Sequence, residues 1–282
     1  MTPFEEEKSV FTISKITLEL IAVAAIVIGS LLFVSIIYLT QFIPEFEGGI
    51  FFTDIVPVLF GIGATIGSLF ASFKIYGYRT FNGKIWLLIS LGNLLWTLGE
   101  FGWFYFEVIL GIDTPYPSFA DVLWLAGFLP LYIALFKTNQ LIKLRLTRKL
   151  LILYVIISVA CIFAIIFLVI WPIATYPVSE DFAISEKVTS IIYPVTDILL
   201  FLFAMLVLLR FRGAKISWAW LILAMSFLID VFADSWFSII LWEELYYTYH
   251  PVDLLWLLSY SLVAIAVIYL GYARSRKLLL RI

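Results

Sequence analysis

Eight long apolar stretches limit what this chain of 282 residues can fold into. A transmembrane helix needs about 20 mostly apolar residues, and each stretch is close to that length or longer. The residues are 63% hydrophobic and 13% charged, whereas soluble proteins are about half apolar and about a quarter charged. The sequence therefore predicts an all-α, multi-pass protein of the cell membrane, with helices at 17–40, 53–73, 85–108, 119–136, 150–172, 188–209, 217–241 and 252–272.

Basic residues lie almost entirely on one side of the predicted helices. Of the 18 Lys and Arg residues, all except Lys187 fall in or beside the loops of that side. Because Lys and Arg are enriched in cytoplasmic loops, we expect both termini to be cytoplasmic. The first apolar stretch is long enough to span, so we expect a signal anchor rather than a cleaved signal peptide. The formal net charge of -2 argues against a nucleic-acid partner, which leaves the lipid bilayer as the expected environment.

Acidic residues have the opposite distribution. Of the 20 Asp and Glu residues, only Glu5, Glu6, Glu7 and Glu19 share the basic side. A charge near the bilayer centre costs about 2.5–3.5 kcal/mol on insertion scales, so an acid inside an apolar stretch needs a partner or a function. The acids on the predicted helices and at their ends include Asp54, Glu100, Glu107, Asp121, Asp197, Asp230, Asp234 and Asp253.

One face of the third predicted helix combines acids with tryptophans. Trp96, Glu100, Trp103 and Glu107 follow one another at spacings of four, three and four residues, which places them on the same side of a helix. Gly99 leaves room beside this face for another backbone or a ligand. A belt of interfacial tryptophans with acids that reach the headgroups is the plainer interpretation. We favour a site because Glu100 lies roughly 20 Å above the start of the helix, within the apolar layer.

The seventh predicted helix carries two acids on adjacent turns. Asp230 and Asp234 are four residues apart, and their carboxylates repel each other when both are ionised. A shared proton, a bound cation, or hydrogen bonds from Ser226, Ser235, tyrosines and tryptophans would make the pair tolerable. No basic side chain is available at that height. This pair is the clearest functional signal in the sequence, with structural hydrogen bonding as the alternative.

Three further acids fit both a structural and a functional interpretation. Asp121 follows Ser118 in the pattern of a capping box, and Asp253 stands in the first turn of a helix, where the helix dipole favours an acid. Asp197 follows Pro194 inside the sixth predicted helix, where a proline frees backbone groups that a polar side chain can satisfy. Each of the three can instead line a cavity.

Aromatic residues gather in the same outer region as the acids. An interfacial aromatic belt accounts for many of them. Acids combined with indole faces are also what a cationic ligand needs, through charge pairing and cation–π contact. The residues that we expect to bind a ligand are Glu100, Asp230, Asp234, Asp197, Asp121 and Asp253, with Trp103, Trp124, Trp236 and Trp256 as the walls of the cavity.

The chain also resembles itself. The two matching segments are Ala120-Asp121-Val122-Leu123-Trp124-Leu125 and Val252-Asp253-Leu254-Leu255-Trp256-Leu257. Such a match predicts two tandem four-helix repeats, over residues 1–140 and 141–282. An even number of helices in each repeat gives both the same orientation, so a pseudo-two-fold axis would run along the membrane normal.

A short motif resembles a known class of membrane modules. It reads Pro117-Ser118-Phe119-Ala120-Asp121-Val122-Leu123-Trp124-Leu125-Ala126-Gly127-Phe128-Leu129-Pro130-Leu131. It is similar to the multi-helix sensory regions that precede PAS, histidine-kinase or diguanylate-cyclase modules in bacteria and archaea. The resemblance implies a prokaryotic sensory or ligand-binding membrane domain. The second repeat has no counterpart of Pro130, and no output module follows up to Ile282.

Together these patterns predict a non-enzymatic membrane sensor whose outward-facing, acidic and aromatic cavity takes a small cationic ligand or protons. Its state would pass to a cytoplasmic signalling partner at the basic loops. A transporter or ion-coupled carrier, a membrane-embedded lipid hydrolase and a structural subunit of a membrane complex are the alternatives. We expect no cofactor, since phosphate-binding loops and a mid-helix lysine are missing, and a bound metal is left open. One cysteine, Cys161, and one histidine, His250, exclude a disulfide within the chain and the usual zinc clusters.

Overall fold

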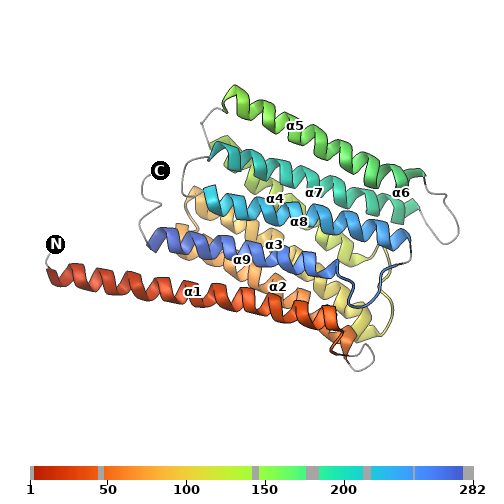
Figure 1. Ribbon diagram of the computed structural model, residues 1–282, viewed down its shortest axis with the longest axis horizontal. Coiled ribbons are helices and arrows are strands. Elements are labelled where there is room, and N and C mark those ends of the chain that lie inside the picture. Colours follow the sequence, from red (N-terminus) through yellow and green to blue (C-terminus); the bar gives the residue numbers. More distant parts are fainter. Residues whose placement is uncertain are drawn as a thin grey trace.

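The computed structural model describes residues 3–43, 48–141, 146–175, 184–211, 217–243 and 245–275, and these are helical apart from short connections (Figure 1). Several helices continue without a break into a π-helical segment or a further helix. The elements are α1 (Pro3–Thr40), α2 (Gly49–Phe70) with η2 (Ala71–Tyr76), α3 (Phe81–Phe104) with η3 (Tyr105–Leu110), α4 (Phe119–Leu141), α5 (Arg148–Ile165) with η4 (Ile166–Ile170) and α6 (Trp171–Thr175), α7 (Ile184–Arg210), α8 (Ser217–Trp242) and α9 (Asp253–Ser275).

Within the described residues, eight helical segments are long and apolar enough to cross a membrane, which confirms the predicted number of spans. Each π-helical segment extends its helix, so α2 with η2, α3 with η3, and α5 with η4 and α6 count as one span each. The spans begin and end within a few residues of the positions that hydropathy predicts. Lipid-exposed helices satisfy their backbone groups internally, and this is why an apolar stretch of this length folds as a helix in a bilayer.

Six of the spans close into a ring. Along the ring α2 packs on α3, α3 on α4, α4 on α7, α7 on α8, α8 on α9, and α9 returns to α2. The other two lie outside the ring: α1 packs on α9, and α5 packs on α7 (Figure 1). In an apolar stretch of 18 residues from each of these two spans, only 11% is buried, so most of that surface faces lipid.

Local sequence signals explain where several helices begin and end. Thr80 accepts a hydrogen bond from the amide of Gly83 and caps the start of α3. Gly77 and Gly111 follow η2 and η3 with φ angles of +81° and +66°, which a residue with a Cβ rarely adopts. These signals are short-range, so they place the helix ends without reference to the rest of the fold.

Apolar side chains fill one half of the ring. In the half nearest the chain termini, the rings of Trp86 on α3 and Trp220 on α8 pack with centroids 6.3 Å apart. Leu135, Val207 and Leu270, from α4, α7 and α9, are almost fully buried in the same half. Among the described residues, apolar side chains therefore pack the interior of this half.

Both termini lie at the same end of the bundle (Figure 1). The basic residues near that end whose burial is described are Lys74, Arg79, Lys84, Lys137, Arg148, Lys149, Arg210 and Arg274. The rest of the basic loops and tail, including Lys143, Arg145, Arg212, Lys215, Arg276, Lys277 and Arg281, lie outside the described residues. The surface predicted for a cytoplasmic partner therefore falls largely outside them as well.

Candidate functional site

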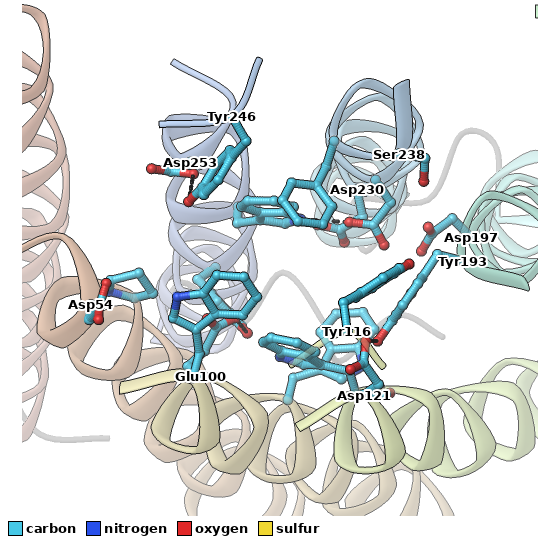
Figure 2. A pocket seen from close by; sticks show the side chains of 18 of the residues that line it. Asp54, Glu100, Tyr116, Asp121, Tyr193, Asp197, Asp230, Ser238, Tyr246 and Asp253 are labelled. Carbon is cyan, nitrogen blue, oxygen red and sulfur yellow. Dashed lines mark hydrogen bonds between the residues drawn. The ribbon is translucent and has the colours of Figure 1, made fainter. Parts of the chain in front are cut away.

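A cavity of about 120 Å³ lies inside the ring, in the half away from the termini, and all six ring helices line it (Figure 2). Seven of its lining residues are acids: Asp54, Glu100, Asp121, Asp197, Asp230, Asp234 and Asp253. Ten are aromatic: Trp96, Trp103, Tyr116, Trp124, Phe128, Tyr193, Phe237, Tyr246, Trp256 and Tyr260. None of the described residues that line it is Lys, Arg or His. The cavity therefore holds many carboxyl groups and no protein cation beside them.

The acids extend from one end of the bundle to its middle. Asp121 and Asp253 stand in the first turns of α4 and α9. Asp197 follows Ile184, the first residue of α7, by 13 residues. At about 1.5 Å per residue it lies roughly 20 Å along the helix, near the middle of a bilayer core about 30 Å thick. A carboxyl group at that depth has no bulk water to solvate it.

Two of the deep acids, on different helices, face each other. Asp197 on α7 and Asp234 on α8 interact directly through their carboxyl groups. Asp234 also accepts a hydrogen bond of 2.7 Å from the indole N–H of Trp256. Both carboxylate oxygens of Asp197 are buried and receive no hydrogen bond from a donor among the described residues. Because two carboxylates have no hydrogen to share when both are ionised, the pair needs a proton or a cation.

Asp230 points into the same cavity but has a different partner. Its carboxyl group interacts with Ser259 of α9, and its Oδ2 atom is buried without a hydrogen bond from a described residue. The serines expected from the sequence do not serve the pair: Ser226 is 2.8 Å from the hydroxyl of Ser259, and the Ser235 hydroxyl has no partner among the described residues. Asp230 and Asp234 therefore line the same cavity but interact with different partners.

Glu100 is held by aromatic side chains from two neighbouring helices. The phenol of Tyr260 on α9 donates a hydrogen bond of 2.9 Å to Oε1, and the indole of Trp124 on α4 also reaches the carboxylate. The space beside Gly99 is filled by Trp124 rather than by a ligand. Glu100 thus points into the ring, as the helical spacing predicts.

Asp121 and Asp253, the acids at the starts of α4 and α9, fit both the structural and the functional interpretation of the sequence. Asp121 accepts the amide of Ser118 at 2.6 Å, as a capping box requires, and its other oxygen accepts the phenol of Tyr193 at 2.9 Å. Asp253 accepts a hydrogen bond of 3.2 Å from Tyr246. Both acids therefore stabilise a helix start and line the cavity.

Asp54 is a cavity acid that the sequence-based site lacks. It is buried on α2, its Oδ1 is 3.3 Å from the hydroxyl of Thr53, and its Oδ2 has no hydrogen-bond partner among the described residues. The sequence places Asp54 at the second position of a predicted span, where an acid is normally interfacial. In the structure α2 begins at Gly49, four residues before the predicted start, so Asp54 lies deeper in the helix than the sequence indicates. For this reason Asp54 was not among the residues expected to bind a ligand.

Of the ten residues expected to bind a ligand, Trp236 alone lies outside the cavity lining. It is 41% exposed and meets the ring of His250 edge-on, with centroids 5.3 Å apart. Phe237 lines the cavity in its place, because it lies three residues after Asp234 and so shares the inward face of α8. Trp236 is one residue out of phase with that face. Glu107, on the stripe of Glu100, also lies outside the lining and accepts a hydrogen bond from Thr114.

Three tyrosine hydroxyls, which the sequence-based site did not include, donate to cavity acids: Tyr193 to Asp121, Tyr246 to Asp253 and Tyr260 to Glu100. Tyr193 and Tyr260 come from ring helices, whereas Tyr116 and Tyr246 come from the α3–α4 and α8–α9 connections. Burial raises the pKa of Tyr116 and of Tyr246 well above the usual value for a phenol, so both remain neutral donors. The hydroxyls of Tyr193, Tyr246 and Tyr260 therefore satisfy acids without bringing a positive charge, whereas the Tyr116 hydroxyl lies 3.1 Å from that of Ser190.

The carboxyl groups of the cavity do not gather at one point. Within the described part of the chain, no three His, Cys, Asp or Glu side chains converge closely enough to hold one metal ion. The carboxyl groups are instead spread around an aromatic space, which suits ammonium N–H donors and cation–π contacts.

Comparison of the chain with models of known protein families, with curated proteins and with solved structures gives no match.

Proposed function

We propose that this protein is a membrane receptor that binds a small organic cation in the ring cavity. One observation carries the proposal: seven carboxyl groups line the cavity, and none of its described lining residues is basic. A buried charge without a partner is strongly unfavourable, so a cavity of this composition favours a ligand that brings positive charge. A mobile cation would neutralise the carboxyl groups at the depth where water cannot.

The aromatic lining supports an organic rather than an inorganic cation. Trp103, Trp124 and Trp256 present indole rings to the cavity, and such rings attract a cation over their faces by about 0.5–2 kcal/mol. Hydrocarbon attached to an ammonium group would also pack against these rings. A water molecule needs roughly 10–15 Å³ in this measure of volume, so a cavity of about 120 Å³ has room for a ligand of several heavy atoms.

Charge distribution supports an external opening. The described basic residues cluster at the end of the bundle that holds both termini, and Lys- and Arg-rich ends face the cytoplasm. We therefore assign both termini to the cytoplasm and the cavity to the external half of the membrane. The half of the ring around Trp86 and Trp220 supports binding without passage, because apolar side chains of the described residues are packed there. The resemblance to prokaryotic sensory membrane regions agrees with a receptor that signals to a cytoplasmic partner.

Two four-helix repeats, 1–140 and 141–282, form part of this proposal. The order α2, α3, α4 around the ring recurs as α7, α8, α9. Trp124 on α4 reaches Glu100 on the preceding helix, and Trp256 on α9 donates to Asp234 on the preceding helix. Matched halves around a midplane site are also typical of carriers, so an ion-coupled transporter is the second candidate.

Thermal unfolding of the purified protein tests binding. We expect n-butylammonium to raise the melting temperature and n-butanol to leave it unchanged, because only the former brings charge. A ligand at 100 times its Kd stabilises by about 2.7 kcal/mol, which is readily measured. The double substitution Asp230→Asn with Asp234→Asn should abolish the shift, while Asp113→Asn, in the α3–α4 connection outside the cavity, should preserve it. The proposal fails if the double variant is stabilised as much as the wild type.

Flux measurements separate a receptor from a carrier. The full chain in proteoliposomes should bind the ammonium probe but not accumulate it inside, with or without an imposed proton or sodium gradient. Uptake that depends on the protein, and that is lost in the same double variant, would assign the cavity to a transporter instead.

A further inference from the structure

The acids of the cavity form two groups on opposite arcs of the ring. The first arc consists of α2, α3 and α9, in which α2 packs on both other helices, and the second consists of α4, α7 and α8, in which α7 does so. The first arc carries Asp54, Glu100 and Asp253, and the second carries Asp121, Asp197, Asp230 and Asp234. Figure 2 shows Asp54 and Asp253 on one side of the space and Asp121, Asp197 and Asp230 on the other.

Each arc holds a buried carboxylate oxygen that no described residue satisfies. In the first arc this is Oδ2 of Asp54, whose side chain is 8% exposed. In the second arc these are both oxygens of Asp197, which is 1% exposed, and Oδ2 of Asp230. A buried acceptor without a donor costs about 1–3 kcal/mol, more when it is charged. Two separate places in the cavity therefore lack a donor.

Electrostatic interactions run mainly within the arcs. Asp253 interacts with Asp54 and Glu100 in the first arc. Asp197 interacts with Asp234 and Asp230 in the second. Among the described cavity acids, the acid–acid interactions between the arcs involve Glu100, which reaches both acids of α8. One positive charge placed in either arc would thus leave the outer acids of the other without a counter-charge.

Aromatic rings separate the two groups where the arcs meet. At the α3–α4 contact, Trp103 and Trp124 have ring centroids 6.2 Å apart. At the α8–α9 contact, Phe237 and Trp256 lie 5.5 Å apart. Trp103 and Phe237, at 6.4 Å, join the two contacts. A ligand that reached from one acidic group to the other would pass an apolar, aromatic surface.

From this juxtaposition we propose that the ligand is a dication, an aliphatic α,ω-diamine or a longer polyamine, with one ammonium group in each acidic arc. The inference rests on the proposed binding function and adds the ligand class. One ammonium would donate to Asp54 and the other to Asp197, since an ammonium offers three donors and no acceptor. The methylene chain between them would lie against Trp103, Trp124, Phe237 and Trp256. A monoamine satisfies one arc only.

A length series on the wild-type protein tests the proposal without any variant. The probes are the diamines from 1,3-diaminopropane to 1,8-diaminooctane, each compared with the n-alkylamine of the same chain length. Calorimetric titration and thermal unfolding should show an optimum at one diamine length. At that length we expect the diamine to bind at least tenfold more tightly than its monoamine. Equal affinities of diamine and monoamine at every length would overturn the proposal.

Single substitutions then assign one end of the ligand to each arc. Asp54→Asn and Asp197→Asn should each weaken the best diamine at least tenfold, while the matched n-alkylamine should lose affinity in only one of the two variants. Asp113→Asn serves as the control and should leave both probes unchanged. Loss of monoamine binding in both variants to the same extent as diamine binding would place the charges in one shared site and contradict the two-arc arrangement.

The two proposals fail in different ways. If no ammonium probe of either kind stabilises the wild-type protein, the binding function is wrong and the diamine assignment falls with it. If monoamines bind as tightly as diamines, cation binding stands and the dication alone is rejected.

Discussion

Replacing Gly127 with alanine tests the contact between α3 and α4 on which one wall of the cavity depends. A Cβ at this position of α4 would meet the indole of Trp96, with 2.7 Å to Nε1, and would lie 3.0 Å from the carbonyl oxygen of Gly92. Trp96 has little freedom to move aside, because its N–H donates to the carbonyl of Trp124 at 2.9 Å and its ring packs on Phe128. The added methyl group therefore has to displace the indole or separate the helices.

The opposing free energies can be estimated from these contacts. Alanine is about 0.5–1 kcal/mol more favourable than glycine in a helix interior. Forcing a methyl group into a packed contact costs about 1–3 kcal/mol, and losing the Trp96 hydrogen bond costs about 0.6–1.7 kcal/mol in a membrane protein. The unfavourable effects are larger, so Gly127→Ala should lower the free energy of unfolding by about 1–4 kcal/mol. Each kcal/mol should lower the melting temperature by about 2–4 °C.

Gly63→Ala is the matched control for this substitution. Gly63 lies in α2, also inside a membrane-spanning helix, and a Cβ there meets no atom within 4 Å. It gains the helix preference without the clash, so its melting temperature should equal or slightly exceed that of the wild type. The assay is thermal unfolding of both variants in the same detergent. If Gly127→Ala proves as stable as Gly63→Ala, α3 and α4 do not approach as closely as described here.

Two further predictions concern single polar contacts. Trp256→Phe keeps the ring but removes the N–H that bonds Asp234, so we expect a loss of about 0.6–1.7 kcal/mol in thermal unfolding, and an unchanged melting temperature would contradict that bond. Burial lowers the pKa of His250, whose Nδ1 accepts the amide of Val252 at 3.2 Å, below the value of about 6.5 in the unfolded chain. The unfolded state then binds the proton more readily, so stability is complete above pH 6.5 and decreases as the pH falls below it. The advantage of the wild type over His250→Gln in melting temperature should therefore shrink between pH 7.5 and 5.5, and a constant difference would refute the assignment.

The shape of the cavity could be predicted only in part from the sequence. Asp230 and Asp234 stand out in an apolar stretch, and helical spacing correctly turns Glu100 toward the interior. Trp236, expected as a wall of the cavity, lies outside its lining, because its presence in the outer aromatic region does not show how α8 is rotated. A rotation of one residue, about 100°, decides between a ring in the cavity and a ring at its outside.

Partners that are distant in sequence were beyond prediction. Tyr260 and Glu100, which form one of the cavity's hydrogen bonds, are 160 residues apart, and Tyr193 and Asp121 are 72 apart. Tyrosines occur throughout the chain, and nothing local distinguishes those that donate to a buried acid. Asp54 was misplaced for a related reason, since its depth depends on where α2 begins.

The amino-acid sequence alone determined the membrane environment, the eight spans and the side on which basic residues gather. These properties follow from the length and polarity of contiguous segments, because each segment spans the bilayer according to its own length and hydrophobicity. The tertiary structure alone decided that six of the spans close into a ring, that α1 and α5 stay outside it, and that the acids divide between two arcs. Those features depend on which helix faces meet. Whether a buried carboxylate on one helix receives a hydrogen bond is decided by the side chains of the neighbouring helix.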